Sequence, residues 1–151
     1  MPETNVPGWD RIGKLVEGLA YSSRPIHASV RDITKKLGLG RRGPFILNLV
    51  SEGSEYPNEL ATKFRTSRSL ITADLNRLIE AGLLTATPAE TDKRRTRLQL
   101  TEAGRIVCGN IRREMARIVT RNLAAYSEDE TRLFMEMLQA VGRLEPDEEY
   151  G

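Results

Sequence analysis

Residues 92–104 read DKRRTRLQLTEAG. Four of the five residues from Lys93 to Arg97 are cations. Thr96 to Leu100 then alternates polar and apolar side chains, which is typical of a short half-buried strand. Thr101 follows where a helix N-cap is expected, because its hydroxyl can accept from the free backbone N–H groups of the next turn. The stretch therefore predicts a cationic loop, a short strand and the start of a helix.

Two short helices around a tight turn are predicted just before this stretch. Pro57 suits the start of the first helix, and Arg65-Thr66-Ser67 forms the turn. The second helix runs from Ser67 to Ala81, with Gly82 as its stop. Its inner stripe is expected to consist of Ile71, Leu75, Leu78 and Ile79. A first strand over 83–87 would then pair with 96–100 across a polar loop at 88–95.

Amphipathic helices are predicted on the N-terminal side. Trp9, Ile12, Val16 and Leu19 recur at helical spacing. Arg24-Pro25 interrupts this helix, because proline disfavours helical geometry in the residue before it. The sequence leaves open whether the interruption is a kink or a break. A second amphipathic helix is expected over 26–37, ending at Gly38, and a short buried helix follows Pro44.

The C-terminal side is predicted to hold two more helices. A long helix after Thr101 has Val107, Ile111, Met115 and Ile118 on one face, and Ser127–Glu130 is a capping box that opens a last helix. The inner face of that last helix comprises Leu133, Phe134, Met137, Leu138, Val141 and Leu144. These terminal helices are apolar over more surface than the middle of the chain could cover, which favours burial against a second copy.

The composition is that of an ordinary globular chain of 151 residues, and it sets broad limits on the function. Between Lys63 and Arg97, basic residues outnumber acidic ones eight to four, whereas from Ser127 onward acidic residues outnumber basic ones eight to two. This segregation favours a local polyanion site. A single cysteine excludes an internal disulfide, and neither a signal peptide nor a membrane-spanning run is seen. A cytoplasmic protein with no membrane partner is therefore expected.

Four short motifs resemble the MarR family of winged-helix transcriptional regulators. They are Glu59-Leu60-Ala61, Asn76–Leu83 (NRLIEAGL), Asp92-Lys93-Arg94 and Leu100–Gly104 (LTEAG). The resemblance implies a homodimer, a palindromic operator of double-stranded DNA and, usually, repression relieved by a small ligand. It places the helix from Ser67 to Ala81 in the major groove and the loop at 88–95 near the minor groove. Arg95 and Arg97 depart from the family pattern, because they make this wing unusually cationic.

The predicted fold is mainly α with a small β wing: a winged helix-turn-helix with N- and C-terminal dimerisation helices. The expected boundaries are 1–40 for the N-terminal helices of the dimerisation region and 41–101 for the DNA-binding domain. The C-terminal dimerisation helices follow at 102–145, and an acidic tail occupies 146–151.

The wing supplies the first group of candidate DNA contacts. Arg94 is the candidate for the minor groove, where a narrow groove has an enhanced negative potential. By the resemblance, Asp92 orients this arginine, while Lys93 and Arg95 contact or attract phosphate. The alternative is a solvated charged hairpin.

The helix-turn-helix supplies the second group. Arg68 and Asn76 are the candidates for base edges, since arginine suits guanine and asparagine suits adenine. Ser67, Ser69 and Thr72 are candidates for phosphate contacts or for capping the helix. Arg65 in the turn is also predicted to contact DNA. The alternative for each of these side chains is that it is simply exposed to solvent.

An effector site is the next hypothesis. Trp9, Tyr21, Arg24 and His27 lie in the N-terminal segment, and a cation, an imidazole and aromatic rings suit a planar aromatic carboxylate or phenol. In the alternative reading Trp9 anchors the dimer core, and Arg24 and His27 face water.

Redox, metal and catalytic chemistry are the remaining hypotheses. Cys108 is a candidate redox sensor, with a small packed helical residue as the alternative. One histidine and one cysteine give no metal-ligand spacing, and no phosphate-cradling glycine loop or nucleophile–base pair is found. Neither enzymatic activity nor a cofactor or metal is expected. A winged-helix module that docks protein instead of DNA is the remaining alternative.

Overall fold

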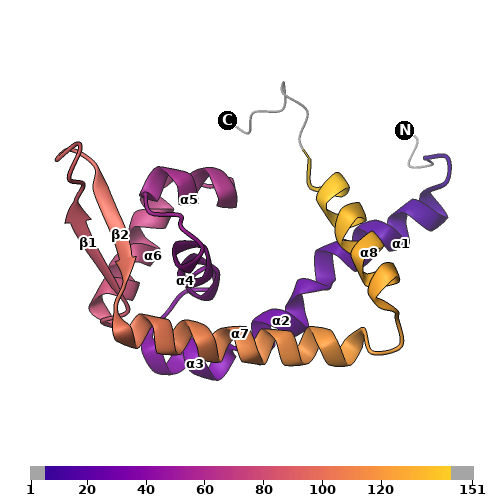
Figure 1. Ribbon diagram of the computed structural model, residues 1–151. Helices are drawn as coiled ribbons and strands as arrows, with labels where there is room; N and C mark the ends of the chain where they lie inside the picture. The colour runs from indigo at the N-terminus through magenta and orange to yellow at the C-terminus, as the bar shows by residue number, and fades with distance from the viewer. Residues whose placement is uncertain (1–5, 144–151) are drawn as a thin grey trace.

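The computed structural model describes residues 6–143, which form eight helices and a two-stranded antiparallel sheet (Figure 1). In chain order these are α1 (Trp9–Tyr21), α2 (Ser23–Ser29), α3 (Arg31–Leu37), α4 (Gly43–Ser51), α5 (Pro57–Phe64), α6 (Arg68–Glu80), β1 (Leu84–Pro88), β2 (Thr96–Leu100), α7 (Glu102–Asn122) and α8 (Glu128–Val141). The mainly helical fold with a small β wing is confirmed. Leu144 and the predicted acidic tail at 146–151 lie outside the described residues.

The core lies where α4 to α7 and the two strands meet. Its fully buried side chains include Ile46, Leu47, Leu60, Ile71, Leu78, Leu83, Leu84, Leu98 and Ile111. Burying each such side chain contributes roughly 1.5–3 kcal/mol relative to leaving it in water. This core fixes α6 and the wing, which carry the candidate DNA contacts.

The inner stripe of α6 differs from the prediction at two positions. Ile79 is 38% exposed, so its expected place in the core was wrong. Asp74 is buried instead, at 4% exposure, because it lies one turn from both Ile71 and Leu78 and is paired with Arg42. The buried stripe is therefore Ile71, Asp74, Leu75 and Leu78.

The interruption near Pro25 also differs from the prediction. The interruption is a kink at Ser22, and Pro25 lies in the first turn of α2. Proline has no N–H for the carbonyl of Tyr21 and its ring crowds that group, so the helix is disturbed upstream of the proline itself. Ser22 keeps helical dihedrals, with φ −62° and ψ −25°, and its N–H donates to the Gly18 carbonyl at 2.8 Å. A second interruption, at Val30, divides the helix predicted over 26–37 into α2 and α3.

Several boundaries agree with local sequence signals. Gly38 ends α3 with a φ of 67°, and the Thr101 hydroxyl accepts from the Gly104 N–H at 2.9 Å. The capping box at the start of α8 is present, with Ser127 and Glu130 each accepting from the other's backbone N–H. The first strand starts at Leu84, one residue later than predicted, and extends to Pro88, which pairs with Thr96.

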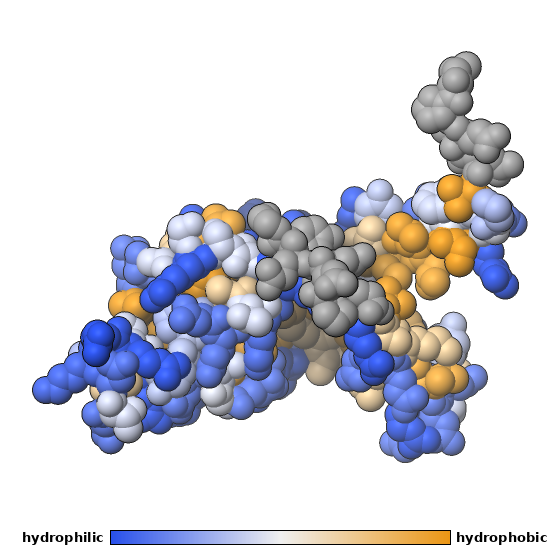
Figure 2. Space-filling view, turned by 90° about the horizontal axis from the view of Figure 1, so that it is seen from above, coloured by the Kyte–Doolittle hydropathy of each residue, from blue (hydrophilic) through white to orange (hydrophobic). Residues whose placement is uncertain are grey.

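α1 and α8 lie at the end of the molecule away from the wing (Figure 1). Gly13 is the one buried residue of α1, and α8 has none. Figure 2 shows apolar side chains gathered at this end. The exposed ones include Trp9, Ile12, Leu15, Val16, Leu133, Phe134, Met137, Leu138 and Val141. Among the described helices, none has the length and apolarity needed to cross a membrane.

Candidate nucleic-acid interface

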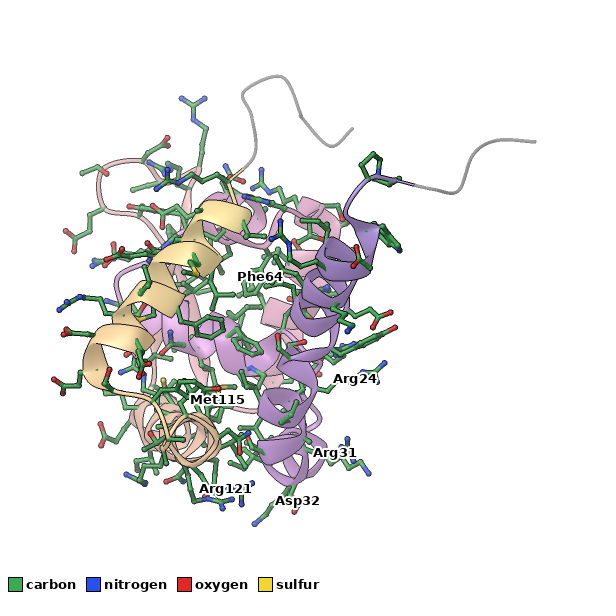
Figure 3. All side chains as sticks on the ribbon, turned by 90° about the vertical axis from the view of Figure 1, so that its right-hand side faces the viewer. Arg24, Arg31, Asp32, Phe64, Met115 and Arg121 are labelled. Atoms are coloured by element: carbon green, nitrogen blue, oxygen red, sulfur yellow. The ribbon has the colours of Figure 1, made fainter. Side chains whose placement is uncertain are left out.

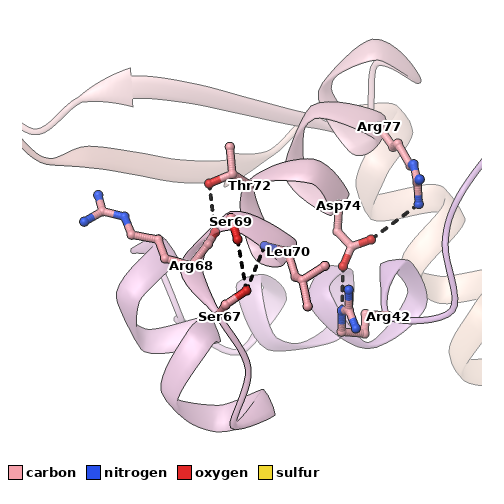
Figure 4. Close-up of polar contacts among 8 residues, drawn as sticks. All are labelled: Arg42, Ser67, Arg68, Ser69, Leu70, Thr72, Asp74 and Arg77. Atoms are coloured by element: carbon pink, nitrogen blue, oxygen red, sulfur yellow. Dashed lines mark hydrogen bonds and ion pairs between the residues drawn. The ribbon is translucent and has the colours of Figure 1, made fainter. Parts of the chain in front are cut away.

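The outer face of α6 presents a small polar surface at its N-terminal half (Figure 4). Arg68, Ser69, Thr72 and Asn76 are all exposed there, at helical spacings that place them on one side. The Ser67 hydroxyl accepts from the Leu70 N–H at 3.3 Å and lies 3.0 Å from the Ser69 hydroxyl. Thr72 donates to the Arg68 carbonyl at 2.9 Å. Ser67 thus caps the helix as predicted, and Arg68 and Asn76 carry the longer polar side chains of this face.

A buried carboxylate paired with two partly exposed arginines holds α6 from behind. Arg42 Nε lies 2.6 Å from Asp74 Oδ2, and the Arg77 guanidinium lies 3.6 Å from Asp74 Oδ1 (Figure 4). A Cβ atom on Gly40 would lie 2.9 Å from Asp74 Oδ1, so this loop passes close to the carboxylate. A buried carboxylate is tolerated only when paired. The pair therefore ties α6 to the segment before α4. Sequence reasoning missed it, although an aspartate inside an apolar stripe is a signal.

Arg65 occupies the turn between α5 and α6. Its φ of 49° makes it the one non-glycine residue with a positive φ between residues 6 and 143. Its guanidinium donates to the carbonyl of Gly142, the C-cap of α8, at 2.5 Å. The predicted DNA-contacting cation therefore lies against the end of α8.

The tip of the wing is ordered by backbone hydrogen bonds around Asp92. Its carboxylate accepts from the Arg94 N–H at 3.0 Å, and its carbonyl accepts from the Arg95 N–H at 2.9 Å. The Ala89 N–H donates to the Arg95 carbonyl at 2.8 Å, which closes the loop. The Arg94 side chain is 96% exposed and lies 3.8 Å from the Asp92 carboxylate. Asp92 is thus placed to orient the loop around Arg94, and the Arg94 side chain projects into solvent.

The other two wing arginines contact the loop between α4 and α5. Arg97 makes two hydrogen bonds to the Glu55 carboxylate, Nε–Oε2 at 3.1 Å and a second to Oε1 at 2.8 Å. These bonds lower the pKa of Glu55 and raise that of Arg97. The Arg95 guanidinium lies 4.0 Å from the centre of the Tyr56 ring. Arg97 is therefore neutralised by its partner, which sequence reasoning missed because Glu55 lies 42 residues away.

The wing is joined to α7 through Thr101 and Gly104. The Thr101 hydroxyl donates to the Gly82 carbonyl at 2.6 Å, and its N–H donates to the Leu83 carbonyl at 3.1 Å. A Cβ atom on Gly104 would lie 2.0 Å from the Leu83 oxygen. The Leu-Thr-x-x-Gly spacing thus combines a cap with a close helix–strand contact.

The candidate effector residues lie in two places. Arg24 and His27 line a hollow of about 400 Å³ that also includes Arg31, Thr34 and Arg41. The Arg24 guanidinium lies 4.2 Å from the Tyr21 ring centre, and the His27 ring meets Phe45 edge-on at 5.2 Å. Burial and the nearby Arg41 lower the pKa of His27. In Figure 3, Arg24 and Arg31 lie on the outer side.

Trp9 is remote from that hollow. It begins α1 and packs on Gly13, and the 12 residues that separate it from Tyr21 correspond to about 18 Å of helix. The structure therefore places Arg24 and His27 at the hollow, with Tyr21 against the Arg24 guanidinium, and leaves Trp9 apart from them.

Cys108 lies in the core rather than at a surface. It is 2% exposed in the N-terminal third of α7. A reactive thiol needs an accessible, electropositive setting, so this position favours the packed alternative. Within residues 6–143, no three side chains among His, Cys, Asp and Glu gather closely enough to hold a metal ion.

Comparisons with known proteins agree with this geometry. Residues 39–104 match the winged helix DNA-binding domain family. The transcriptional regulator BldR from Sulfolobus solfataricus has a TM-score of 0.74 at 22% identity, over 92% of this chain and 100% of that chain. A mutant MarR from E. coli complexed with operator DNA has a TM-score of 0.71 at 17% identity, over 91% and 100%.

A third similar structure carries a small molecule. CouR from Rhodococcus jostii bound to p-coumaroyl-CoA has a TM-score of 0.72 at 21% identity, over 90% of this chain and 96% of that chain. A comparison with curated proteins found no match. The fold that the sequence motifs predicted is thus confirmed.

Proposed function

Because the chain is a winged-helix protein with the MarR-type fold, we propose that it is a sequence-specific transcriptional regulator that binds double-stranded DNA as a homodimer. One observation carries the proposal. The polar outer face of α6, held from behind by Asp74, lies beside a wing whose Arg94 is 96% exposed. Two contact surfaces on one compact domain suit adjacent grooves of a duplex.

In the proposed complex, α6 enters the major groove, which is wide enough for one helix. Arg68 and Asn76 read base edges there, while Ser67, Ser69 and Thr72 are close enough to the helix start to meet phosphates. Arg94 enters the minor groove, and Lys93 and Arg95 add positive charge near the backbone. Cation–phosphate contacts release counterions, so binding should weaken steeply with salt.

A second copy of the chain is the proposed partner. Apolar side chains of α1 and α8 are exposed in the single chain; Trp9, Phe134 and Leu138, for example, are 39–52% exposed. A two-fold dimer would cover them and place two α6 helices about one DNA turn apart, which matches a palindromic operator with half-sites about 34 Å apart.

The proposed regulation is repression relieved by a small aromatic acid or phenol. The hollow beside Arg24 and His27 offers cations and an imidazole at the junction of α2, α3 and α4. The likeness to CouR bound to p-coumaroyl-CoA supports an effector of aromatic character. A ligand there would contact the segment that leads from the dimerisation helices into the DNA-binding domain.

A selection experiment tests the proposal. Full-length protein is used to select duplexes from the genomic DNA that flanks its own coding region, and affinity is then measured by gel shift at several salt concentrations. Arg94→Ala should bind more weakly than the wild type, whereas Arg121→Ala should not. Arg121→Ala is a suitable control because this substitution removes the same charge at the far end of α7. A wild type that selects no duplex, or whose binding is indifferent to salt, would contradict the proposal and favour a protein-docking module.

A further inference from the structure

We propose that Glu55 and Tyr56 are positioning residues that hold the wing at a set place relative to the helix-turn-helix. We call this pair the wing brace. In this arrangement Arg97 supports DNA binding indirectly, through its contact with Glu55, and is not a phosphate contact. The DNA part of the inference rests on the proposed function, whereas the structural part does not.

The wing brace makes three kinds of contact from two consecutive residues. The Glu55 carbonyl accepts from the Leu98 N–H at 2.7 Å, and its carboxylate accepts both hydrogen bonds from Arg97. The Tyr56 ring lies under the Arg95 guanidinium. Backbone, ion-pair and cation–π contacts thus meet three of the four residues from Arg95 to Leu98, close to the tip that carries Arg94.

The same two residues are tied to the first helix of the helix-turn-helix. Tyr56 is the N-cap of α5, and its N–H donates to the Glu59 carboxylate at 3.3 Å. The preceding residue, Ser54, is buried and accepts from Lys63 Nζ at 2.9 Å. Tyr56 is therefore bonded to the first turn of α5, and the adjacent Ser54 is bonded to its last turn, so the wing brace is tied to this helix. It links the wing to the helix pair that presents α6.

Neutralising Glu55 distinguishes a positioning role of this residue from a direct electrostatic effect of its charge on DNA binding. A carboxylate on a DNA-facing domain repels phosphate, so its neutralisation should strengthen DNA binding if charge alone matters. If Glu55 holds Arg97 and the wing in place, neutralisation should instead weaken binding. Both side chains are 37% exposed, so the pair is open enough for its charges to be felt by a duplex.

The experiment compares five full-length proteins: wild type, Glu55→Gln, Arg97→Gln, Tyr56→Ala and Tyr56→Phe. Amide hydrogen exchange is read without DNA at three wing residues: Ala89 and Arg95, whose N–H groups donate within the wing loop, and Leu98, whose N–H donates to the Glu55 carbonyl. Exchange there should quicken roughly tenfold in the first three variants, while core amides of α4 stay unchanged. Tyr56→Phe keeps the ring and should behave as the wild type.

The same proteins are then titrated with the duplex that the wild type selects. Glu55→Gln should lose affinity several-fold, and Arg97→Gln should lose affinity without lowering the salt slope, since no phosphate contact is removed. A double variant, Glu55→Arg with Arg97→Glu, should recover wing protection.

The outcomes separate the brace from the proposed function. Unchanged exchange at Leu98 in Glu55→Gln, or tighter DNA binding by that variant, would overturn the inference. A drop of about one unit in the salt slope of Arg97→Gln would make Arg97 a phosphate contact and overturn its indirect role. If the wild type selects no duplex, the proposed function fails, and the exchange measurement still decides whether the brace holds the wing.

Discussion

Gly104 lies against the carbonyl oxygen of Leu83 with no space between them for a side chain. An added Cβ atom would lie 2.0 Å from that oxygen and 3.0 Å from its carbon. The atoms that an added Cβ would meet belong to the backbone and not to the end of a flexible side chain, so they cannot move away by changing a rotamer. The start of α7 is therefore packed directly on the entry to the wing.

Gly104→Ala should lower the free energy of unfolding by roughly 1–3 kcal/mol, the usual cost of forcing a methyl group into a packed site. Urea denaturation would measure the loss. Gly109→Ala is the matched control, because it lies in the same helix and its Cβ would meet nothing closer than Arg113 at 4.0 Å. That control should gain stability, since alanine suits a helix better than glycine. Equal effects of the two variants on the free energy of unfolding would mean that the close contact with the Leu83 carbonyl does not destabilise Gly104→Ala.

Arg94→Ala should weaken binding to every duplex and lower the slope of log affinity against log salt by about one unit. The reason is that Arg94 is 96% exposed at the tip of the wing, where it can meet the DNA backbone or the minor groove. Fluorescence anisotropy with a labelled duplex at four salt concentrations would give the slope. A slope equal to that of the wild type would exclude this role.

Asn76→Ala should act differently, through sequence preference. Asparagine pairs with the major-groove edge of adenine, so its loss should cost about 1–3 kcal/mol on the preferred sequence and nearly nothing at a duplex already changed at that base pair. Affinities for a set of single-base variants of the selected duplex would reveal the position. An equal loss on all duplexes would show that Asn76 does not read a base.

His27 should titrate below its ordinary pKa of 6.5, because burial and the Arg41 cation both disfavour the imidazolium. The folded state then binds its proton less readily than the unfolded state, so stability falls as the pH drops from 6.5 through the folded pKa. Proton NMR of the imidazole would follow the titration. Arg41→Ala should raise the midpoint and Lys36→Ala should leave it unchanged. A wild-type midpoint at or above 6.5 would contradict the expected direction.

Phe134→Glu should convert the proposed dimer to monomers. Phe134 is 45% exposed in the single chain, and a charge there would have to be desolvated at the proposed interface. Sedimentation velocity would give the mass. Gln139→Glu adds the same charge on another face of α8 and should leave the dimer intact. A wild type that sediments as a monomer would exclude the interface outright.

Local signals predicted most of the element boundaries. Ser67, Thr101 and Ser127 each cap a helix by accepting from a backbone N–H three residues later, so a few neighbouring residues suffice to place these starts. Gly38 and Gly82 end helices with φ values of 67° and 72°, a conformation that favours glycine.

The missed features depend on residues far apart in the chain. Arg42 and Asp74 are separated by 32 residues, and Glu55 and Arg97 by 42. No helical or strand period connects them, so the predicted inner stripe omits Asp74, and the sequence shows Arg97 only as one more cation of the wing. The prediction puts the helix interruption at Arg24-Pro25 instead of Ser22 for a different reason. Proline affects the carbonyl four residues earlier as well as the residue beside it.

α7 can act as a lever arm. Its first turn is fixed to the wing by Thr101 and Gly104, and its far end lies beside the helices proposed to form the dimer. A helix of 21 residues is about 32 Å long, so a tilt of about 5° around the fixed end moves the other end by about 3 Å. A small sideways shift at the dimer end is therefore equivalent to a few degrees of rotation of the whole winged-helix domain that carries the wing. In the proposed dimer, this rotation would change the spacing between the two α6 helices without any change inside either winged-helix domain.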